Sequence, residues 1–284
     1  MAITAFIPQI WAAELLVALR KSLVYGQPAV VNRDYEGDIS SYGDTVKITS
    51  ISDPTIGDYV ANSTSITPEE LNDAQRTLVI DQAKYFAFKV DDVNARQARG
   101  SVMSEAMSRA AYKLRDKVDQ YIAALYTTVD SANKVNSGTA VAITSGDLAY
   151  TNLVNLKTEL DEANVGTEGR WAVLPPWYHA LLLQNANFIN AEKSADGGAA
   201  LRNGFIGRAA GFDLFMSNNV VNVTGDDYAV LAGVPSAISY AEQINKVEAY
   251  RPEASFSDAV KGLHLWGAKV IRTDSLAYLL ASKS

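Results

Sequence analysis

The sequence predicts an α+β protein, and three features carry that prediction. Two strand-like runs lie within residues 41–90, separated by a polar stretch too long for a hairpin turn. A long amphipathic helix is predicted from Asp91 or Asp92 to about Thr128. From residue 135 onward, strand-like runs alternate with helical ones, which predicts a mixed region with a sheet of its own.

The composition is that of an ordinary folded protein. The chain has 284 residues, 48% of them hydrophobic and 20% charged, and no Pro/Gly/Ser-rich linker divides it. It contains no cysteine, which excludes disulfides, thiol nucleophiles and cysteine-type zinc sites. The N-terminus lacks the pattern of a signal peptide and no run is long enough to span a membrane, so we expect a soluble, unexported protein. The net charge of −7 argues against a protein that mainly grips nucleic acid, although an acidic chain can still enclose DNA.

Residues 9–25 have the pattern of an amphipathic helix. Its apolar residues Trp11, Leu15, Leu19 and Leu23 recur about every fourth position, and Gly26 follows where the helix should end. Two interpretations stay open: a helix packed on its own domain, or an arm lying on a neighbouring molecule. Membrane contact is less favoured because the polar face is not basic enough.

Residues 41–90 are the most informative part of the chain. Alternation places Val46 and Ile48 on one face of the first strand, with Thr45 and Lys47 on the other. The return run, 76–90, is also predicted as strand. An isolated two-stranded ribbon is only marginally stable in water, so we interpret this excursion as an arm that reaches onto a neighbouring subunit.

A long helix follows, for which Asp91 and Asp92 offer an N-cap. Its apolar residues trace one stripe and predict a structural spine, which starts near Ser101 if Gly100 weakens the first turns. Basic and acidic residues interleave along the remaining faces, which favours a solvated helix surface over weak contact with DNA or a scaffold. The residues concerned are Arg96, Arg99, Arg109, Lys113, Arg115 and Lys117, with Glu105, Asp116 and Asp119.

The C-terminal half is predicted to be rich in strands. A helix should start at Ser145 or Asp147 and stop at Gly166, and a flexible loop should lie between Asp196 and Gly204. The expected strands are 140–143, 170–174, 227–233, 237–240, 246–251 and 262–272, and a further helix is expected over 177–187.

The sequence shows no catalytic constellation. His179 and His264 are the only histidines, and both stand among apolar residues, which is typical of structural histidines. The paired acids lie at expected helix starts, loop tips and turns, where solvated carboxylates are common. Residues 204–208 could in principle cradle a phosphate, but a mobile loop is the better interpretation. We therefore predict no enzyme, and no catalytic, cofactor or metal site.

The order of the elements, together with several short segments, resembles the tailed-bacteriophage major capsid proteins of the Hong Kong 97 type fold. Those proteins have an N-terminal arm, an extended hairpin called the E-loop, a long spine helix, an axial domain and a peripheral domain. The similar segments cover nearly the whole chain. They are 24–26 with 32–37, 43–46, 85–92, 204–212 leading to 217–219, and 267–272.

The resemblance implies a division of the chain and a mechanical function. The N-arm would be 1–40, the E-loop with its supporting strands 41–90, the spine helix 91–134, the axial domain 135–245 and the return to the peripheral domain 246–284. Such subunits form hexamers and pentamers that tile an icosahedral shell around double-stranded DNA. An encapsulin-like compartment that holds a cargo enzyme is the alternative with the same fold. A soluble α+β enzyme is a more distant one.

The resemblance also implies contacts and partners. We expect contacts between subunits at Trp11, Leu15 and Leu19 of the arm, and at Tyr59, Ile66 and Leu71 of the loop. The loop tip, 57–72, has no lysine, so covalent crosslinking of the kind found in some family members is not expected. Because Met1 lies close to the arm helix, a separate scaffolding protein should direct assembly. The further expected partners are a portal, a decoration protein and the enclosed DNA, which the protein would contact without specificity. No membrane contact is expected. The protein would assemble in the host cytoplasm and reside in the virion.

Overall fold

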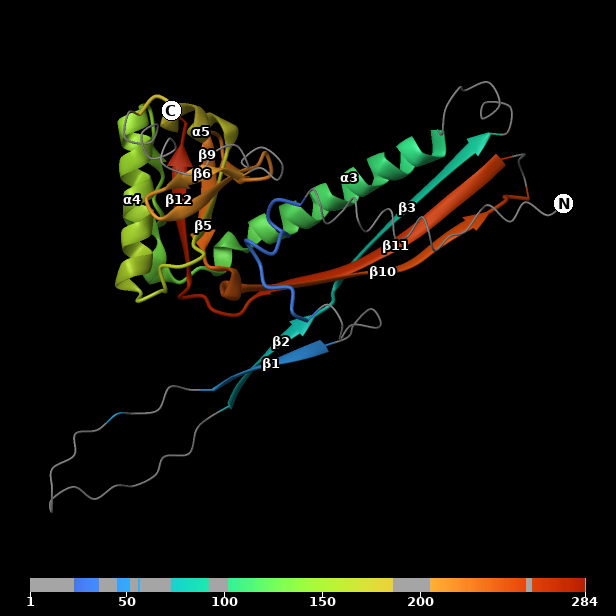
Figure 1. The fold of residues 1–284 in the computed structure, drawn as a ribbon, viewed down its shortest axis with the longest axis horizontal. Helices are drawn as coiled ribbons and strands as arrows, with labels where there is room; N and C mark the ends of the chain where they lie inside the picture. The colour runs from blue at the N-terminus through green and yellow to red at the C-terminus, as the bar shows by residue number, and fades with distance from the viewer. Residues whose placement is uncertain are drawn as a thin grey trace, which may run out of the picture.

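The computed structural model describes residues 23–35, 45–51, 56, 73–91, 102–185, 205–253 and 257–283. Figure 1 shows three parts: a long narrow sheet with one helix along it, an α/β unit at one end of that sheet, and a two-stranded hairpin that projects from it. We call these the elongated unit, the compact unit and the hairpin.

The elongated unit is an antiparallel sheet in the order β10-β11-β3, formed by β10 (Ile238–Tyr250), β11 (Ser257–Val270) and β3 (Gln82–Asp91). Helix α3 (Val102–Ala123) lies along one face and continues as a short 3-10 helix, η2 (Ala124–Thr128). The predicted spine helix, expected to run to about Thr128, is therefore confirmed from Val102 to Thr128. Its buried stripe consists of Met107, Ala111, Leu114, Val118 and Ile122.

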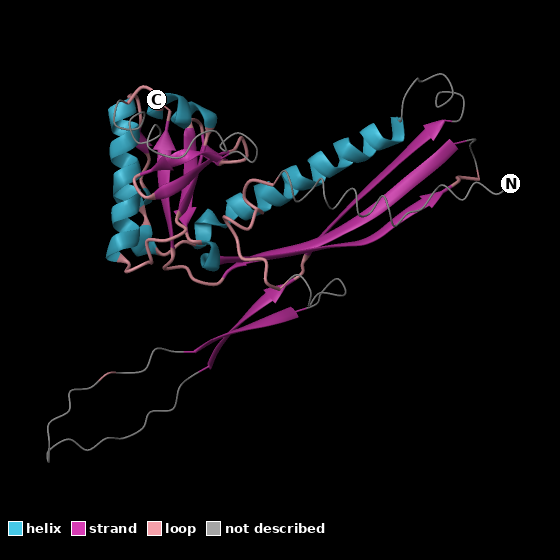
Figure 2. Cartoon of the chain, viewed as in Figure 1, coloured by secondary structure: helices cyan, strands magenta, loops and turns pink. Residues whose placement is uncertain are grey.

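The hairpin consists of β1 (Thr45–Ile51) and β2 (Asp73–Val79), which pair only with each other. As predicted, Val46 and Ile48 are buried while Thr45 and Lys47 are exposed. The two buried residues pack with Leu78 and Ile80 against Ala241, Leu265 and Ile271 on the face of the elongated sheet opposite α3. From that contact the hairpin points away from both units (Figure 2). The predicted return strand is divided near Ile80, because its first half pairs with β1 and its second half with β11.

The compact unit is built on a seven-stranded sheet with helices on one face. Its strands run in the order β4-β12-β9-β5-β7-β6, and β8 pairs with β9. Helices α4 (Gly146–Glu162) and α5 (Pro176–Leu182) cover one face. The predicted Ser145 cap is present, since its hydroxyl accepts from the Leu148 N–H. The strand bounds are β4 Val141–Ala142, β5 Trp171–Leu174, β6 Phe205–Ala209, β7 Phe212–Met216, β8 Val221–Thr224, β9 Asp227–Gly233 and β12 Leu276–Ser282.

Short 3-10 helices connect the main elements of this half of the chain: η3 (Ser131–Asn133), η4 (Val135–Gly138) and η5 (Pro235–Ala237). Helix α4 ends before Gly166, because Asn164 takes the left-handed conformation that terminates it.

Three local predictions were wrong. Two separate strands were expected over 237–251, but β10 is continuous through a bulge between Ile244 and Lys246, where polar residues hid the alternation. Residues 205–208 belong to strand β6 rather than to a mobile loop. Strand β12 was not foreseen, and it pairs with β9 in the compact unit, so 246–284 is divided between the two sheets. Asp91, expected at a helix start, ends β3; residues 92–101 lie outside the described part of the chain.

Residues 23–33, here called the strap, join the two units. Leu23, Tyr25, Val30 and Val31 are at most 1% exposed. They share one core with the end of α3, with Trp171 and its neighbours on the second face of the seven-stranded sheet, and with Trp266 of β11. The strap therefore fills the joint where the spine helix and both sheets meet.

Gly267 allows the hairpin to approach the elongated sheet. A Cβ atom at this position would lie 2.3 Å from the Val79 carbonyl oxygen and 3.0 Å from Ile80 Cδ1. Nearby, the Lys269 ammonium group donates to the Thr77 carbonyl at 2.8 Å. The backbone of the hairpin base thus lies directly on β11.

We expect Gly267→Ala to displace the hairpin base and to lower the free energy of unfolding by roughly 1–3 kcal/mol, because the clash is with backbone. Urea unfolding of the unassembled subunit measures this. Gly166→Ala is the matched control, since no atom lies within 4 Å of the Cβ it would add. Equal stability of the two variants would contradict the packing described for Gly267.

Candidate assembly surfaces

The strap is fixed to the spine helix by one buried carboxylate. Asp119, 2% exposed, accepts backbone N–H bonds from Val24 (3.0 Å), Tyr25 (3.1 Å) and Gly26 (3.2 Å). Burial raises the pKa of Asp119 to about 6, although the three N–H groups and the Arg115 charge favour the ionised form. Three consecutive residues of the strap are therefore held by a single side chain.

A second buried carboxylate holds the end of the strap. Glu242 on β10 pairs with Arg33, whose guanidinium also donates to the Gly26 carbonyl at 2.9 Å. The Tyr240 hydroxyl donates to Glu242 Oε2 at 2.5 Å, and His264 Nε2 lies 3.4 Å from the same oxygen. Burial alone would raise the pKa of Glu242, but the interactions with His264, Arg33 and Tyr240 lower it to about 2.

These two anchors determine where the N-terminal segment leaves the body of the protein. The strap begins at Leu23, so residues 1–22 start from the joint between the two units, beside the end of α3. Asp119 comes from α3 and Glu242 from β10, and the strap contacts both. A segment that starts at a rigid joint has a defined origin on every subunit, which a connection between subunits requires.

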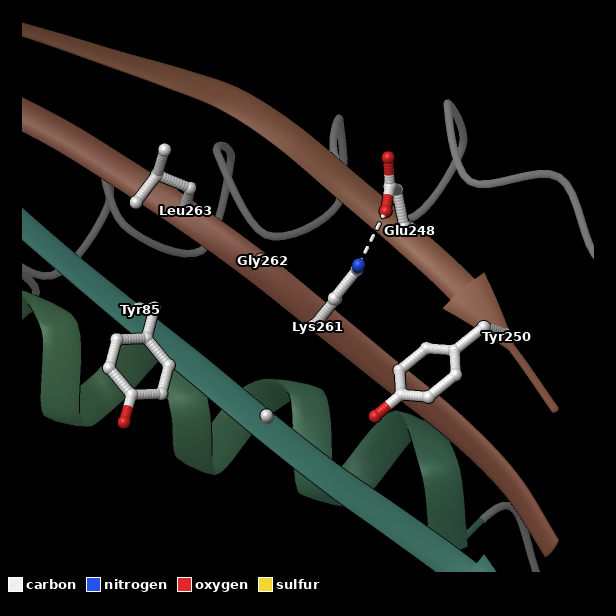
Figure 3. A pocket seen from close by; sticks show the side chains of 7 residues that line it. Tyr85, Glu248, Tyr250, Lys261, Gly262 and Leu263 are labelled. Carbon is white, nitrogen blue, oxygen red and sulfur yellow. Dashed lines mark ion pairs between the residues drawn. The ribbon is translucent and has the colours of Figure 1, made fainter. Parts of the chain in front are cut away.

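The far half of the elongated sheet presents an open face on the hairpin side. There, Tyr85 is 80% exposed and Tyr250 is 46% exposed, and with Leu263 they line a hollow of about 420 Å³ (Figure 3). Within it, Lys261 Nζ pairs with Glu248 Oε2 at 2.9 Å and lies 5.4 Å from the centre of the Tyr250 ring. This combination of exposed aromatic and aliphatic surface with a charged rim is typical of protein–protein contact surfaces.

A second hollow lies between η4 and α4, and it is polar. Its volume is about 470 Å³, and Asn136, Asn152, Asn155 and Glu159 are among its lining residues. In the described part of the chain, no group of three His, Cys, Asp or Glu residues is placed to hold a metal ion. None of the described helices is long and apolar enough to cross a membrane.

The two histidines lie in different units of the fold, His264 in β11 and His179 in α5. His264 is fully buried beside Trp266, with ring centroids 4.8 Å apart, as expected of a core histidine. His179 lies in the last turn of the short helix α5. Of the two positions expected for the histidines, core or surface, His264 therefore occupies the core.

The six predicted contact residues lie outside the described residues. Trp11, Leu15 and Leu19 precede the strap, and Tyr59, Ile66 and Leu71 lie in the segment between β1 and β2. What the structure does describe is the two places from which these segments start, namely the strap and the hairpin.

Sequence reasoning missed the two anchors. Asp119 was grouped with solvated charges on the helix surface, but it is buried, while Arg109, Lys113 and Lys117 are exposed as expected. One signal was available: Asp119 follows Val118 and precedes Ile122, so it stands beside the apolar stripe of the helix. Glu242 had a weaker signal, as a lone acid two residues after Tyr240 and two before Ile244.

The long sheet with its spine helix, the compact α/β unit and the projecting hairpin define a capsid subunit of the Hong Kong 97 type. The chain belongs to the phage capsid protein family, whose model matches residues 74–279. It is also 34% identical to a chain of Mycobacterium phage Che8, with 88% of each chain covered and a TM-score of 0.68. The protein is thus a shell-forming major capsid protein of a tailed phage, located in the virion capsid.

More distant structures share the fold. A chain from the capsid of cyanophage P-SCSP1u is 19% identical, with 93% of this chain and 90% of that one covered and a TM-score of 0.69. A virus-like particle from Pyrococcus furiosus is 14% identical, with 95% and 98% covered and a TM-score of 0.57. A comparison with curated proteins gave no significant match. The encapsulin-like alternative is less well supported, because the matching family is a phage capsid protein family and the 34% identical chain is from a phage.

The Asp119 anchor should make stability depend on pH. Folding raises this pKa from 3.8 to about 6, so the contribution of the protonated carboxyl is full below pH 3.8 and is lost as pH rises through about 6. Relative to Asp119→Asn, the wild type should lose roughly 1.4 kcal/mol of stability between about pH 5 and about pH 8. Urea unfolding of the unassembled subunit at a series of pH values measures the difference.

The control for this pH series is Asp116→Asn, on the same helix. The Asp116 carboxylate accepts from Gln120 at 3.1 Å in an exposed contact. Its stability curve should run parallel to that of the wild type. A parallel curve for Asp119→Asn as well would contradict the assignment of the titration to the strap anchor.

Proposed function

We propose that this capsid protein forms hexamers and pentamers of an icosahedral shell around double-stranded DNA, and that two of its segments brace neighbouring subunits. The braces are the N-terminal arm that starts at the strap, and the E-loop that starts at the hairpin. The observation that supports this most directly is the hairpin, which packs on the body only at its base and otherwise points away from it. A two-stranded ribbon in that position needs cover from another molecule.

The open face of the elongated sheet is the surface that we propose for the neighbour's E-loop. Tyr85, Tyr250 and Leu263 offer apolar area, and Lys261 lies among them. The loop tip, 57–72, carries Asp58, Glu69 and Glu70 and no lysine, together with the predicted contact residues Tyr59, Ile66 and Leu71. Apolar residues with an acidic rim match this face in both character and charge.

The units take the domain roles of the family in this proposal. The compact unit is the axial domain at the centres of hexamers and pentamers, as proposed for most of 135–245. The elongated unit, including 238–270, is the peripheral domain, and β12 returns to the axial sheet. The subunit has no enzymatic role in this proposal. Contacts around a five- or six-fold axis are heterologous, so the same two surfaces recur in every subunit.

The finer partners are also part of the proposal. A separate scaffolding protein directs assembly in the host cytoplasm, one vertex holds a portal, a decoration protein binds the outside, and DNA contacts the shell without sequence preference. The shell lacks loop crosslinks, because residues 57–72 contain no lysine. Stability between subunits then depends on buried area and on the two braces.

Replacing Tyr59, Ile66 and Leu71 together by Ser should abolish or strongly reduce shell formation, because the loop loses the apolar area it buries on a neighbour. Negative-stain images and sedimentation of the purified protein measure the yield of shells. Val223→Ser is the control, since Val223 is also exposed, at 40%, but lies on β8 of the compact unit. A normal yield of shells from the triple variant would contradict the brace.

The cargo of native particles separates the proposal from its alternatives. A DNA-filled capsid should contain DNA that is protected from nuclease. A co-purifying enzyme in particles without DNA would indicate an encapsulin-like compartment. A small closed oligomer in light scattering would indicate the soluble-enzyme alternative instead.

A further inference from the structure

The polar hollow of the compact unit lies at one edge of the seven-stranded sheet. Strand β4 is the last strand of the sheet at that end, and it contributes Val141 to the lining. The other lining residues come from η4 and α4 and include Asn136, Asn155 and Glu159. The hollow therefore belongs to the β4 edge of the compact unit.

The lining of the hollow presents oxygen atoms as hydrogen-bond acceptors. The side-chain amide of Asn152 donates to the Leu148 carbonyl at 2.9 Å. The Thr158 hydroxyl donates to the Val154 carbonyl at 3.1 Å. Because these donors are directed at the backbone of α4, the amide and hydroxyl oxygens can accept, together with the Glu159 carboxylate. A ligand that only donates hydrogen bonds complements this lining.

The carboxylate in the hollow favours a cationic ligand. Burial and the nearby charge of Glu162 both raise the pKa of Glu159, since both disfavour its ionised form. A cation beside Glu159 would stabilise that form. A guanidinium group combines the positive charge with five donors in one plane, so it can bind a carboxylate and neighbouring oxygens at the same time.

An exposed arginine lies at the opposite edge of the same sheet. Arg208 is on β6, the last strand at the other end, and its side chain is 62% exposed. Its Nε donates to Asp213 Oδ1 at 2.7 Å, which engages one of the five guanidinium donors. Ala210 and Gly211, with φ of 49° and 84°, form the tight turn between β6 and β7. Arg208 is thus presented by a rigid hairpin.

Helix α4 lies between the hollow and this hairpin. A Cβ atom at Gly211 would lie 3.7 Å from Lys157 Cε, so the β6–β7 turn is beside the flank of α4 that carries Lys157. Glu159 follows two residues later, about 200° further around the helix axis. The hollow and the β6–β7 hairpin therefore lie on opposite sides of the compact unit.

A ring of identical subunits requires two different surfaces of this kind. Around a five- or six-fold axis, each contact joins one surface of a subunit to another surface of its neighbour. The β4 edge offers acceptors and a carboxylate, and the β6 edge offers a guanidinium. The two edges complement each other in charge and in hydrogen bonding.

We propose that Arg208 of one subunit binds in the polar hollow of the next subunit around the ring, where the Glu159 carboxylate pairs with its guanidinium. The inference rests on the proposed function, in that the compact units meet at the centres of hexamers and pentamers. It names the two surfaces by which neighbouring compact units recognise each other. Such a pair contributes mainly to register and to the choice of partner surface.

Charge reversal tests the pair. Glu159→Lys and Arg208→Glu should each lower the yield of shells at least fivefold, because like charges then meet at the contact. The two changes combined should restore at least half of the wild-type yield. Negative-stain images and sedimentation measure the yield, and urea unfolding of the unassembled subunits shows that each variant folds. Glu168→Lys, at an exposed acid between α4 and β5, is the control and should leave the yield unchanged.

Unchanged yields from both single variants would overturn the proposal. So would a combined variant that assembles no better than the weaker single variant. Wild-type protein that forms only a small closed oligomer, without shells, would instead show that the proposed function itself is wrong.

Chemical crosslinking provides the second measurement, because the chain contains no cysteine of its own. Glu159→Cys subunits and Arg208→Cys subunits, assembled together and treated with a short bismaleimide, should give covalent dimers on a denaturing gel. Each variant assembled alone should give monomers. Subunits with both changes should give a ladder of up to six chains.

The control for crosslinking is Val154→Cys assembled with Arg208→Cys. Val154 is 37% exposed on α4 but does not line the hollow, so its dimers should be at least fivefold fewer. Equal crosslinking with the control would overturn the proposal. Dimers from either variant assembled alone would also overturn it, because they would show that identical surfaces meet.

Discussion

The architecture depends on the strap and on the carboxylate that holds it. Asp119 accepts three consecutive backbone N–H groups at the point where the spine helix, the elongated sheet and the compact unit meet. Without a partner at that point, three backbone donors would be left in a core from which water is excluded. Because the carboxylate satisfies them from α3, a segment of irregular backbone can lie inside the joint and connect both units.

This arrangement buries the carboxylate of Asp119, and burial raises its pKa. The pKa of Glu242 is lowered instead, because a cation and a hydroxyl group lie beside its carboxylate. The difference shows what each carboxylate does. Asp119 orders backbone, and burial dominates its titration. Glu242 completes an ion pair with Arg33 and is held ionised. Both attach the strap, so the point at which the N-terminal segment leaves the body is fixed from two directions.

The packed body of the subunit and the segments that leave it have different roles in the proposed shell. The rigid body supplies two well-packed sheets, one long helix and a defined origin for each segment that leaves it. In the proposed function, the segments that leave it reach the neighbouring subunits. Such a subunit is stable as a fold yet incomplete as a surface, and association completes it.

Local sequence determined the elements whose signals are local: the α3 stripe, the Ser145 cap, the alternation of Val46 and Ile48, and the mixed fold class. Only the tertiary structure decided that β12 joins the compact sheet, that β10 continues through a bulge at an edge, and that Asp119 and Glu242 are buried. Strand partners and the burial of a charge depend on residues far away in the chain. Glu242 and Arg33 are 209 positions apart, and no periodicity within either segment can encode that contact.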